Sequence, residues 1–337
     1  MASPVLLTVD TELTWRHYVP GDDWWDNFAR SIEPAGVGIS WQLEVLARHG
    51  LKACFFVDPM PALLYGIAPI ERIVAPIRAA GQEVQLHLHP GWATLAAGGD
   101  PSGIELTGFS RVGQRRLIAQ ASELLVAAGA PQPDAFRSGS YAANDDTLAA
   151  LADLGFAYDA SHNGSHRPLS AIGLPDTRIA PVRAGGIVEV PVTQIEARAG
   201  RLRHLQLCAV SLAELVGALR HASAHRHPLT TIVSHSFELA TRDGFRPNRL
   251  IQRRFERLCT FLADNRARHP TAHFADLADV RLGAEAEPMP AQPMRTARRV
   301  AEQLWSGTRY ERPVEAATAT YGSSVTSAEM LLPLLGI

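Results

Sequence analysis

The sequence lacks several residues and patterns on which common kinds of protein depend. Lys52 is the only lysine, so a phosphate-binding loop or a Schiff base built on lysine is nearly excluded. The three cysteines lie far apart and form no Cys-x-x-Cys pair, which favours a reducing compartment over a disulfide framework. No stretch reaches about 18 consecutive apolar residues, and neither Gly-x-Ser-x-Gly nor Gly-x-Gly-x-x-Gly occurs. The sequence therefore gives no support to a membrane span, an α/β-hydrolase serine or a dinucleotide-binding loop.

An excess of charge of either sign is also missing. The 337 residues include 32 Lys and Arg against 34 Asp and Glu, a net charge of −2. Such a chain has no overall field that would attract nucleic acid or an anionic membrane, so neither is expected as a partner. The N-terminus passes directly into an apolar run and lacks the pattern of a secretion signal, and we therefore expect a cytoplasmic protein.

Short apolar runs alternate with helical patterns through most of the chain. The expected strands are residues 5–9, 53–57, 83–88, 135–136, 156–158, 187–192, 229–233 and 272–274. The expected helices are residues 39–49, 70–80, 111–128, 145–154, 211–222 and 248–268, and most are followed by glycine, a common helix stop. Repeated βα units predict an α/β fold with a mainly parallel sheet. The number of short strands favours an irregular (β/α)7–8 barrel over an open doubly wound sheet.

The composition changes near residue 283. We expect residues 1–282 to form the barrel and residues 283–337 to form a C-terminal extension. This extension combines a linker rich in Ala, Glu and Pro with a tail that is expected to be helical at 295–305. The tail could dock on the barrel, on a partner or on a second copy of the chain, or stay partly disordered, and its composition does not decide among these.

Ionisable residues follow the expected strands at the point where each strand ends. Asp10 and Glu12 follow the first strand, and His87 and His89 close the third. In parallel α/β folds the functional groups come from these C-terminal ends. Residues i and i+2 of a strand share a face, and two imidazoles with one carboxylate are a typical ligand set for a catalytic divalent metal. The second carboxylate is then free to act as a general base.

Five short motifs occur in order between residues 4 and 275. They are Thr8-Val9-Asp10-Thr11-Glu12, Gly81-Gln82-Glu83-Val84-Gln85-Leu86-His87, Phe136-Arg137-Ser138-Gly139-Ser140-Tyr141, Tyr158-Asp159-Ala160-Ser161 and Ser234-His235-Ser236-Phe237. Together they resemble the motifs of the polysaccharide deacetylase family, the chitooligosaccharide-deacetylase homology domain. The Asp-Thr-Glu and His-Leu-His-Pro variants look most similar to an intracellular bacterial branch associated with surface-polysaccharide or lipopolysaccharide biosynthesis. The resemblance implies a distorted (β/α)7-type barrel.

The resemblance also implies metal-dependent hydrolysis of an N-acetyl, or sometimes an O-acetyl, group on a sugar, and thus an enzyme acting on non-peptide carbon–nitrogen bonds. Glu12, His87 and His89 take the positions of the metal ligands, with zinc as the first candidate and cobalt or nickel as the others. Asp10 takes the position of the base that deprotonates the metal-bound water. The second histidine of the family usually comes four residues after the first, where this chain has Gly91, so His89 must replace it.

The remaining motifs imply roles around this centre. Arg137 would orient Asp10, and His235, with Asp159 as its partner, would protonate the departing amine. The third motif lacks its usual proline and places Tyr141 one residue late. The oxyanion donor is therefore left open: it could be the backbone N–H of Ser140, that of Tyr141, or neither.

Aromatic residues lie in loops that are expected to overhang the site. Trp15 follows the first strand, and Trp92 comes shortly after His89. Aromatic faces suit sugar rings, but loops also use tryptophan as a hydrophobic anchor. Trp15, Trp92 and Tyr141 are therefore candidate substrate-binding residues, with hydrophobic anchoring as the alternative.

These features predict a cytoplasmic, metal-dependent deacetylase. A cytoplasmic location favours a precursor as the acetylated sugar substrate, such as a nucleotide sugar, a lipid-linked sugar or a soluble oligosaccharide. Two alternatives stay open. A deformylase or another C–N amide hydrolase would keep the barrel and change the acyl group. A non-catalytic carbohydrate-binding or scaffold protein would carry a decayed site, which the departures in the second and third motifs would fit.

Overall fold

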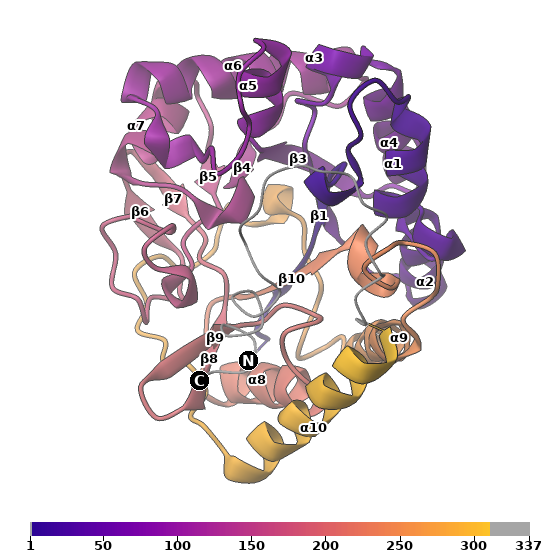
Figure 1. Cartoon of the computed structure of the whole chain (residues 1–337). Coiled ribbons are helices and arrows are strands. Elements are labelled where there is room, and N and C mark those ends of the chain that lie inside the picture. The colour runs from indigo at the N-terminus through magenta and orange to yellow at the C-terminus, as the bar shows by residue number, and fades with distance from the viewer. Residues whose placement is uncertain (1, 311–337) are drawn as a thin grey trace.

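A curved sheet of eight strands, wrapped by helices, forms the centre of the computed structural model, which describes residues 2–310 (Figure 1). The strand order is β10-β1-β2-β3-β4-β5-β7-β6, and every neighbouring pair is parallel except β7 and β6 at one edge. The strands are β1 (Val5–Thr11), β2 (Cys54–Val57), β3 (Glu83–Leu88), β4 (Ala135–Ser138), β5 (Tyr158–Asp159), β6 (Val182–Ala184), β7 (Ile187–Glu189) and β10 (Thr230–His235). The sheet curls into an incomplete barrel, which confirms the predicted irregular (β/α)7–8 barrel with mainly parallel strands.

Helices surround this sheet, and the last of them lies beside the β8–β9 hairpin instead. The helices are α1 (Trp24–Ser31), α2 (Ile39–His49), α3 (Ala62–Tyr65), α4 (Ala68–Ala79), α5 (Gly91–Ala96), α6 (Arg111–Ala127), α7 (Asp145–Asp153), α8 (Leu212–Ala224), α9 (Arg249–Asp264) and α10 (Pro293–Tyr310). In α2, Ile39, Leu43 and Leu46 recur at helical spacing and are buried, and the helix stops where Gly50 adopts a φ of 58°. Strands β1 and β2 are buried along their whole length, as expected for parallel strands covered by helices.

Parallel register brings the C-terminal ends of the strands together at one end of the barrel. Asp10 on β1 lies opposite His235 on β10, and His87 on β3 lies opposite Arg137 on β4. The sheet therefore places Asp10 beside His235 and His87 beside Arg137, although the members of each pair lie far apart in the sequence.

The strand expected at residues 272–274 is wrong. An isolated bridge joins Val5 to Thr271, and a single 3-10 turn, η7 (Phe274–Asp276), follows it. Phe274 is fully buried, and its ring meets that of Phe56 edge to face, with 5.6 Å between the ring centroids. The apolar residues of this segment thus pack into the core instead of extending the sheet.

A two-stranded sheet beside the barrel was not predicted. It pairs β8 (Gln194–Arg198) with β9 (Arg201–His204) in antiparallel fashion. Both strands are rich in charged residues, so they lack the apolar run by which the other strands were recognised. The segment after β9 returns to the barrel, where Gln206 forms a bridge with Val233 of β10.

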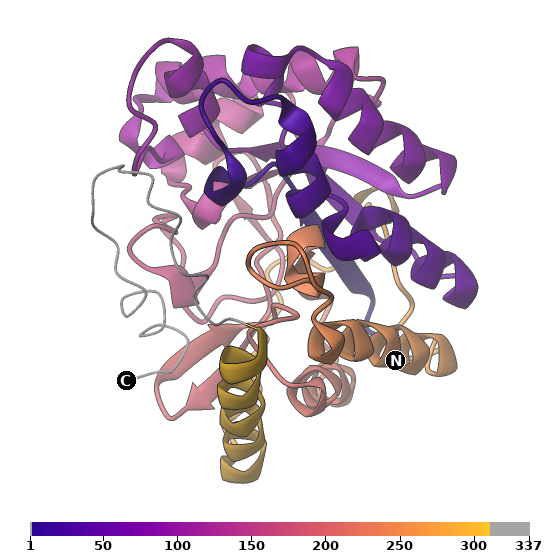
Figure 2. The same ribbon diagram turned by 45° about the vertical axis from the view of Figure 1, so that its right-hand side comes forward.

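Helix α10 spans the segment at 295–305 where a helix was expected, and Figure 2 shows it on the outside of the molecule, beside the β8–β9 hairpin. Ion pairs attach it: Arg299 Nε donates to Glu214 at 3.1 Å, and Arg254 Nη2 donates to Glu302 at 2.9 Å. A boundary between residues 282 and 283 stays a prediction. The expected docking of the tail concerns mainly residues 311–337, which lie outside the described residues.

Within residues 2–310, none of the helices combines the length and the apolar character that crossing a membrane requires.

Candidate metal and catalytic site

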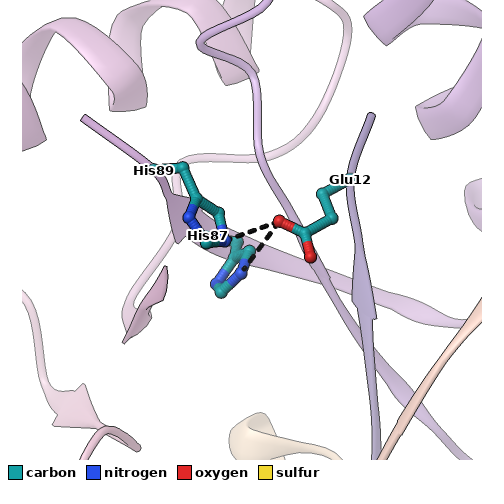
Figure 3. A group of neighbouring side chains, drawn as sticks. All are labelled: Glu12, His87 and His89. Atoms are coloured by element: carbon teal, nitrogen blue, oxygen red, sulfur yellow. Dashed lines mark ion pairs between the residues drawn. The ribbon is translucent and has the colours of Figure 1, made fainter. Parts of the chain in front are cut away.

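Glu12, His87 and His89 converge at the C-terminal end of the barrel, and we call these three residues the metal corner (Figure 3). One ligand atom from each lies within 4.8 Å of the others. Glu12 Oε2 is 2.6 Å from His89 Nε2 and 3.8 Å from His87 Nε2. The two imidazole rings, spaced i and i+2 along the chain, lie 4.9 Å apart and nearly perpendicular. The structure therefore brings together the three residues expected to be metal ligands.

The protonation of this corner suits a metal ion. His87 Nδ1 lies 2.8 Å from the Arg137 carbonyl oxygen, so Nδ1 carries the proton and Nε2 offers its lone pair toward Glu12. Burial lowers the pKa of His87 to about 4, so this ring is neutral at neutral pH. For His89, burial opposes the charged form, but the Glu12 carboxylate outweighs it and raises the pKa to about 9. The Glu12 carboxylate thus stabilises a positive charge on its neighbour, and a divalent cation at this position would supply that charge instead.

Two glycines make room for the metal corner. A Cβ atom added to Gly139 would lie only 2.4 Å from atoms of the His89 ring. A Cβ atom on Gly91 would lie 2.8 Å from the Trp15 ring. The Trp15 ring therefore occupies the space that a side chain at position 91 would need. The need for glycine at 139 was missed, because it arises from a close approach between chain segments that are far apart in sequence.

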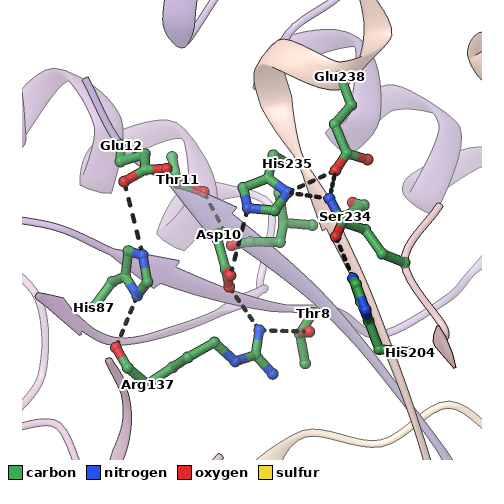
Figure 4. Close-up of polar contacts among 12 residues, drawn as sticks. Thr8, Asp10, Thr11, Glu12, His87, Arg137, His204, Ser234, His235 and Glu238 are labelled. Atoms are coloured by element: carbon green, nitrogen blue, oxygen red, sulfur yellow. Dashed lines mark hydrogen bonds and ion pairs between the residues drawn. The ribbon is translucent and has the colours of Figure 1, made fainter. Parts of the chain in front are cut away.

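Asp10 lies beside the metal corner and is held by Arg137 (Figure 4). Arg137 Nη1 donates to Asp10 Oδ1 at 2.6 Å and to Thr8 Oγ1 at 2.8 Å, and both charged side chains are buried. Burial favours the neutral form of Asp10, but the Arg137 guanidinium and the nearby imidazoles hold its pKa below the usual value. Arg137 is itself fixed, since Nε donates to the Ala160 carbonyl oxygen and the guanidinium stacks over Phe56. Asp10 is thus an ionised, oriented carboxylate.

His235 lies on the other side of Asp10, where its Nε2 is 3.7 Å from Asp10 Oδ2. Its Nδ1 is 2.7 Å from Glu238 Oε1, and Gln206 Nε2 lies 3.3 Å from the same nitrogen. We call Gln206, His235 and Glu238 the acid corner. Burial opposes the charged form of His235, but Glu238 and Asp10 outweigh it and raise the pKa. The Glu238 carboxylate accepts the Nδ1 proton, which leaves Nε2 facing the site.

The expected pair between Asp159 and His235 is not formed. Asp159 Oδ1 accepts the Ser161 hydroxyl at 2.7 Å, and Asp159 lies opposite Glu189 in the pairing of β5 with β7. Burial raises the pKa of Glu189 well above its usual value, and the Asp159 carboxylate raises it further, so the two carboxyl groups share a proton. His235 lies on β10 at the other side of the sheet, and its carboxylate partner is Glu238. The only sequence signal for Glu238 was an acidic residue three positions after the histidine.

Asp58 is a second residue that sequence analysis missed. It directly follows β2, is fully buried and accepts the Met60 N–H at 3.0 Å through Oδ1, while Oδ2 has no hydrogen-bond partner among the described residues. Burial raises the pKa of Asp58 to about 7, although the charge of His89 lowers it. Asp58 could have been predicted from the sequence, because it is an acidic residue that directly follows an expected strand.

The three candidate sugar-binding aromatics differ in their exposure. Trp92 is fully buried and stacks on Trp15 with 4.0 Å between ring centroids, so Trp92 is a hydrophobic anchor and has no free face for a sugar. Trp15 is partly exposed. Tyr141 is buried against the rings of His166 and His204, and its hydroxyl has no hydrogen-bond partner among residues 2–310. Its backbone is in the left-handed region, with a φ of 57°. Tyr141 thus offers a polar group rather than an aromatic platform.

Comparison with solved structures finds similar folds. A putative polysaccharide deacetylase from Mycobacterium smegmatis aligns with a TM-score of 0.55 and 17% sequence identity, covering 85% of this chain and 94% of that one. A family 4 carbohydrate esterase from Streptomyces lividans, in complex with acetate, aligns with a TM-score of 0.43 and 13% identity over 84% of this chain and 98% of that one. The sequence matches no protein-family model and none of the curated proteins with which it was compared. The likeness to the Mycobacterium smegmatis protein shows that the two chains share a fold.

Proposed function

We propose that this chain is a metal-dependent hydrolase that removes an N-acetyl or O-acetyl group from a sugar. The observation that carries the proposal is the convergence of Glu12, His87 and His89 beside two further buried pairs, Asp10–Arg137 and His235–Glu238. The fold shared with a putative polysaccharide deacetylase supports it. The cytoplasmic location and the link to lipopolysaccharide biosynthesis stay predictions.

The metal corner would hold one divalent cation, with zinc preferred over cobalt or nickel because two imidazoles and a carboxylate form the donor set. When bound, the metal polarises the acyl carbonyl and acidifies the attacking water. His87 would hold the metal through Nε2, since its Nδ1–H donates a hydrogen bond to the Arg137 carbonyl oxygen. His89 would hold the metal through Nε2 after losing the proton that it shares with Glu12.

Asp10 and His235 would move the protons of the reaction. Asp10 is kept ionised by Arg137, so it takes a proton from the attacking water. His235 is charged more readily than a free imidazole because Glu238 holds Nδ1, so it gives the Nε2 proton to the departing nitrogen. The two groups face each other across 3.7 Å, which suits a reaction in which one receives a proton and the other releases one.

The test measures metal content and acyl release together. Elemental analysis of the purified protein is expected to find about one zinc, cobalt or nickel ion per chain, and none in His87→Ala/His89→Ala. The wild type is expected to release acetate from one or more members of a panel of N-acetylated and O-acetylated sugars. Release of formate alone from matched formamido sugars would identify a deformylase instead. Bound metal without release of any acyl group, or no metal after incubation with zinc, would contradict the proposal and favour a carbohydrate-binding protein.

A further inference from the structure

A chain of polar side chains leads from the acid corner to the β8–β9 hairpin. His204 closes β9, and Gln206 follows it on the segment that returns to the barrel. This segment is fixed to β10, because Gln206 forms a parallel bridge with Val233 and the Leu207 N–H donates to the Val233 carbonyl oxygen at 2.8 Å. Val233 and His235 share a face of β10, so the bridge directs the Gln206 side chain toward the same side of the sheet as His235.

The Gln206 amide connects Glu238 with His204, which lie at opposite ends of this group of side chains in Figure 4. Gln206 Nε2 donates to Glu238 Oε1 and, at 3.3 Å, to Cys208 Sγ. Gln206 Oε1 lies 2.6 Å from His204 Nε2. A carboxylate only accepts hydrogen bonds, so Glu238 must face the NH2 end of the amide. The carbonyl end is thereby left for an N–H of His204.

The His204 ring is held in place to donate that N–H. Burial lowers the pKa of His204 well below its usual value, so the ring is neutral and carries one proton, on Nε2. Its Nδ1 lies 3.1 Å from the hydroxyl oxygen of Ser165. The ring also packs against those of His166 and Tyr141, with 4.6 and 5.9 Å between centroids. These contacts fix the direction of the Nε2–H bond, and therefore the direction of the Gln206 amide.

Glu238 depends on such support because of where it lies. It is carried by the 3-10 turn η6 (Ser236–Leu239) and not by a strand, and its side chain has three rotatable bonds. Its Oε1 is 2.7 Å from His235 Nδ1, and its Oε2 is buried without a hydrogen-bond partner among residues 2–310. Within that part of the chain, the side chains that hold the carboxylate by hydrogen bonds are thus His235 itself and Gln206.

We propose that Gln206 is a positioning residue that holds the Glu238 carboxylate against His235, and that His204 fixes the direction of the Gln206 amide. Gln206 acts on the proton donor through Glu238, and the β8–β9 hairpin is thereby coupled to the acid corner. The effect on acyl-group hydrolysis rests on the proposed function, whereas the positioning of Glu238 does not.

The variant Gln206→Met separates this support from the other influences on His235. The charged or titratable groups around the His235 ring are Asp10 on β1, Glu12 after β1, Glu238 on η6, Arg16 beyond the Phe237 ring and His204 beyond the Gln206 amide. Methionine keeps the length of the glutamine side chain but has no strong hydrogen-bonding group. Of the charges in this set, Glu238 is the one that Gln206 holds, so its carboxylate is expected to turn away from Nδ1.

The first experiment follows His235 and needs no reaction. An NMR titration of the protein labelled with ¹⁵N-histidine gives the pKa of His235, with His235→Asn to assign the signal. The pKa is expected to fall by about one pH unit in Gln206→Met, the size of one charge-assisted hydrogen bond. His204→Phe keeps a ring against Tyr141 and removes the Nε2–H, so it is expected to lower the pKa of His235 as well.

The control for this titration is Gln120→Met, at an exposed position of α6, which is expected to leave the pKa of His235 unchanged. His204→Phe gives an independent test should Gln206→Met not fold. An unchanged or raised pKa of His235 in Gln206→Met would overturn the proposal, and an unchanged pKa in His204→Phe would remove His204 from it.

The second experiment asks whether Gln206 acts through Glu238 during hydrolysis. Gln206→Met is expected to lower kcat/KM for acetate release about 10-fold at alkaline pH, through kcat and not KM. In a Glu238→Gln background the same substitution is expected to cost less than about 2-fold, because the carboxylate that it positions is gone. Equal losses in the two backgrounds would overturn the proposal. If no acyl group is released from any sugar while the pKa of His235 follows Gln206, the proposed function fails and the positioning role stands.

Discussion

The metal corner and the acid corner are built by different parts of the fold. In the metal corner, Glu12 directly follows β1, His87 lies on β3 and His89 directly follows β3, and a carbonyl group of β4 fixes His87. In the acid corner, His235 comes from β10, but Glu238 comes from a 3-10 turn and Gln206 from the segment after the β8–β9 hairpin. The sheet sets the first geometry, whereas turns and a hairpin set the second.

This difference fits what each corner has to do. Metal ligands must hold fixed positions, and the parallel strands of one sheet, here β1 and β3 on either side of β2, hold side chains rigidly. A proton donor needs a tuned pKa as well as a position within hydrogen-bond reach, and a nearby carboxylate on a turn tunes the pKa. We therefore expect substitutions on the sheet side to change metal binding or the proton-accepting step, and substitutions on the turn side to change the pH dependence.

The largest expected effect is a loss of activity in Asp10→Asn, which distinguishes the role of the base from that of the metal ligands. Asp10→Asn keeps the shape of the side chain but cannot accept a proton, so kcat/KM for acetate release is expected to fall about 10²–10⁴-fold. Metal content should not change, because Asp10 is not one of the three converging ligands. Kinetics and elemental analysis on the same preparation check both parts. Full activity in this variant would remove Asp10 from the proposed role.

The next effect tests how closely the metal corner is packed. Gly139→Ala would place a methyl group against the His89 ring, which must then move, so zinc affinity is expected to fall about 10–100-fold. Competition with a chromogenic chelator measures that affinity. Gly108→Ala is the matched control, since a Cβ atom there meets no atom within 4 Å. Equal affinities in the two variants would show that His89 is not fixed by this approach.

The sequence was sufficient to predict the residues of the metal corner, but it was insufficient to predict the partners of His235 in the acid corner. Asp10, Glu12, His87 and His89 follow from the alternation of side chains at strand ends, and parallel register then brings them together. The partner of His235 depended on the shape of the 3-10 turn that follows β10 and carries Glu238, and strand periodicity carries no information on that. Asp159 was therefore assigned to the wrong place, although the motif that contains it was recognised. The roles of all these residues stay predictions.

The acid corner is tested by its pH dependence. Glu238→Gln keeps a hydrogen-bond acceptor for His235 Nδ1 but removes the negative charge that raises the pKa of His235. His235 then loses its proton at a lower pH, so the alkaline limb of the kcat/KM profile moves to lower pH. Activity at the alkaline end is expected to fall about 10-fold, the size of one charge-assisted hydrogen bond. Glu44→Gln, at an exposed position of α2, serves as the control. An unmoved alkaline limb would mean that Glu238 does not tune the proton donor.

The smallest expected effect concerns the carboxyl pair that belongs to neither corner. The raised pKa of Glu189 means that the folded chain keeps a proton that the unfolded chain has released, at any pH between the unfolded and the folded pKa. The free energy of unfolding therefore falls as pH rises through that range. Glu189→Gln mimics the protonated acid at all pH values, so it is expected to flatten this fall and to stabilise the protein at pH 8 by on the order of 1 kcal/mol.

Urea unfolding at pH 5 and pH 8 measures the difference, with Glu71→Gln on the exposed face of α4 as the control. If the pH 5 to pH 8 difference equals that of the wild type, the pair does not share a proton. If acetate release keeps its wild-type pH profile while stability changes, Asp159 and Glu189 support the barrel and leave proton transfer to the acid corner.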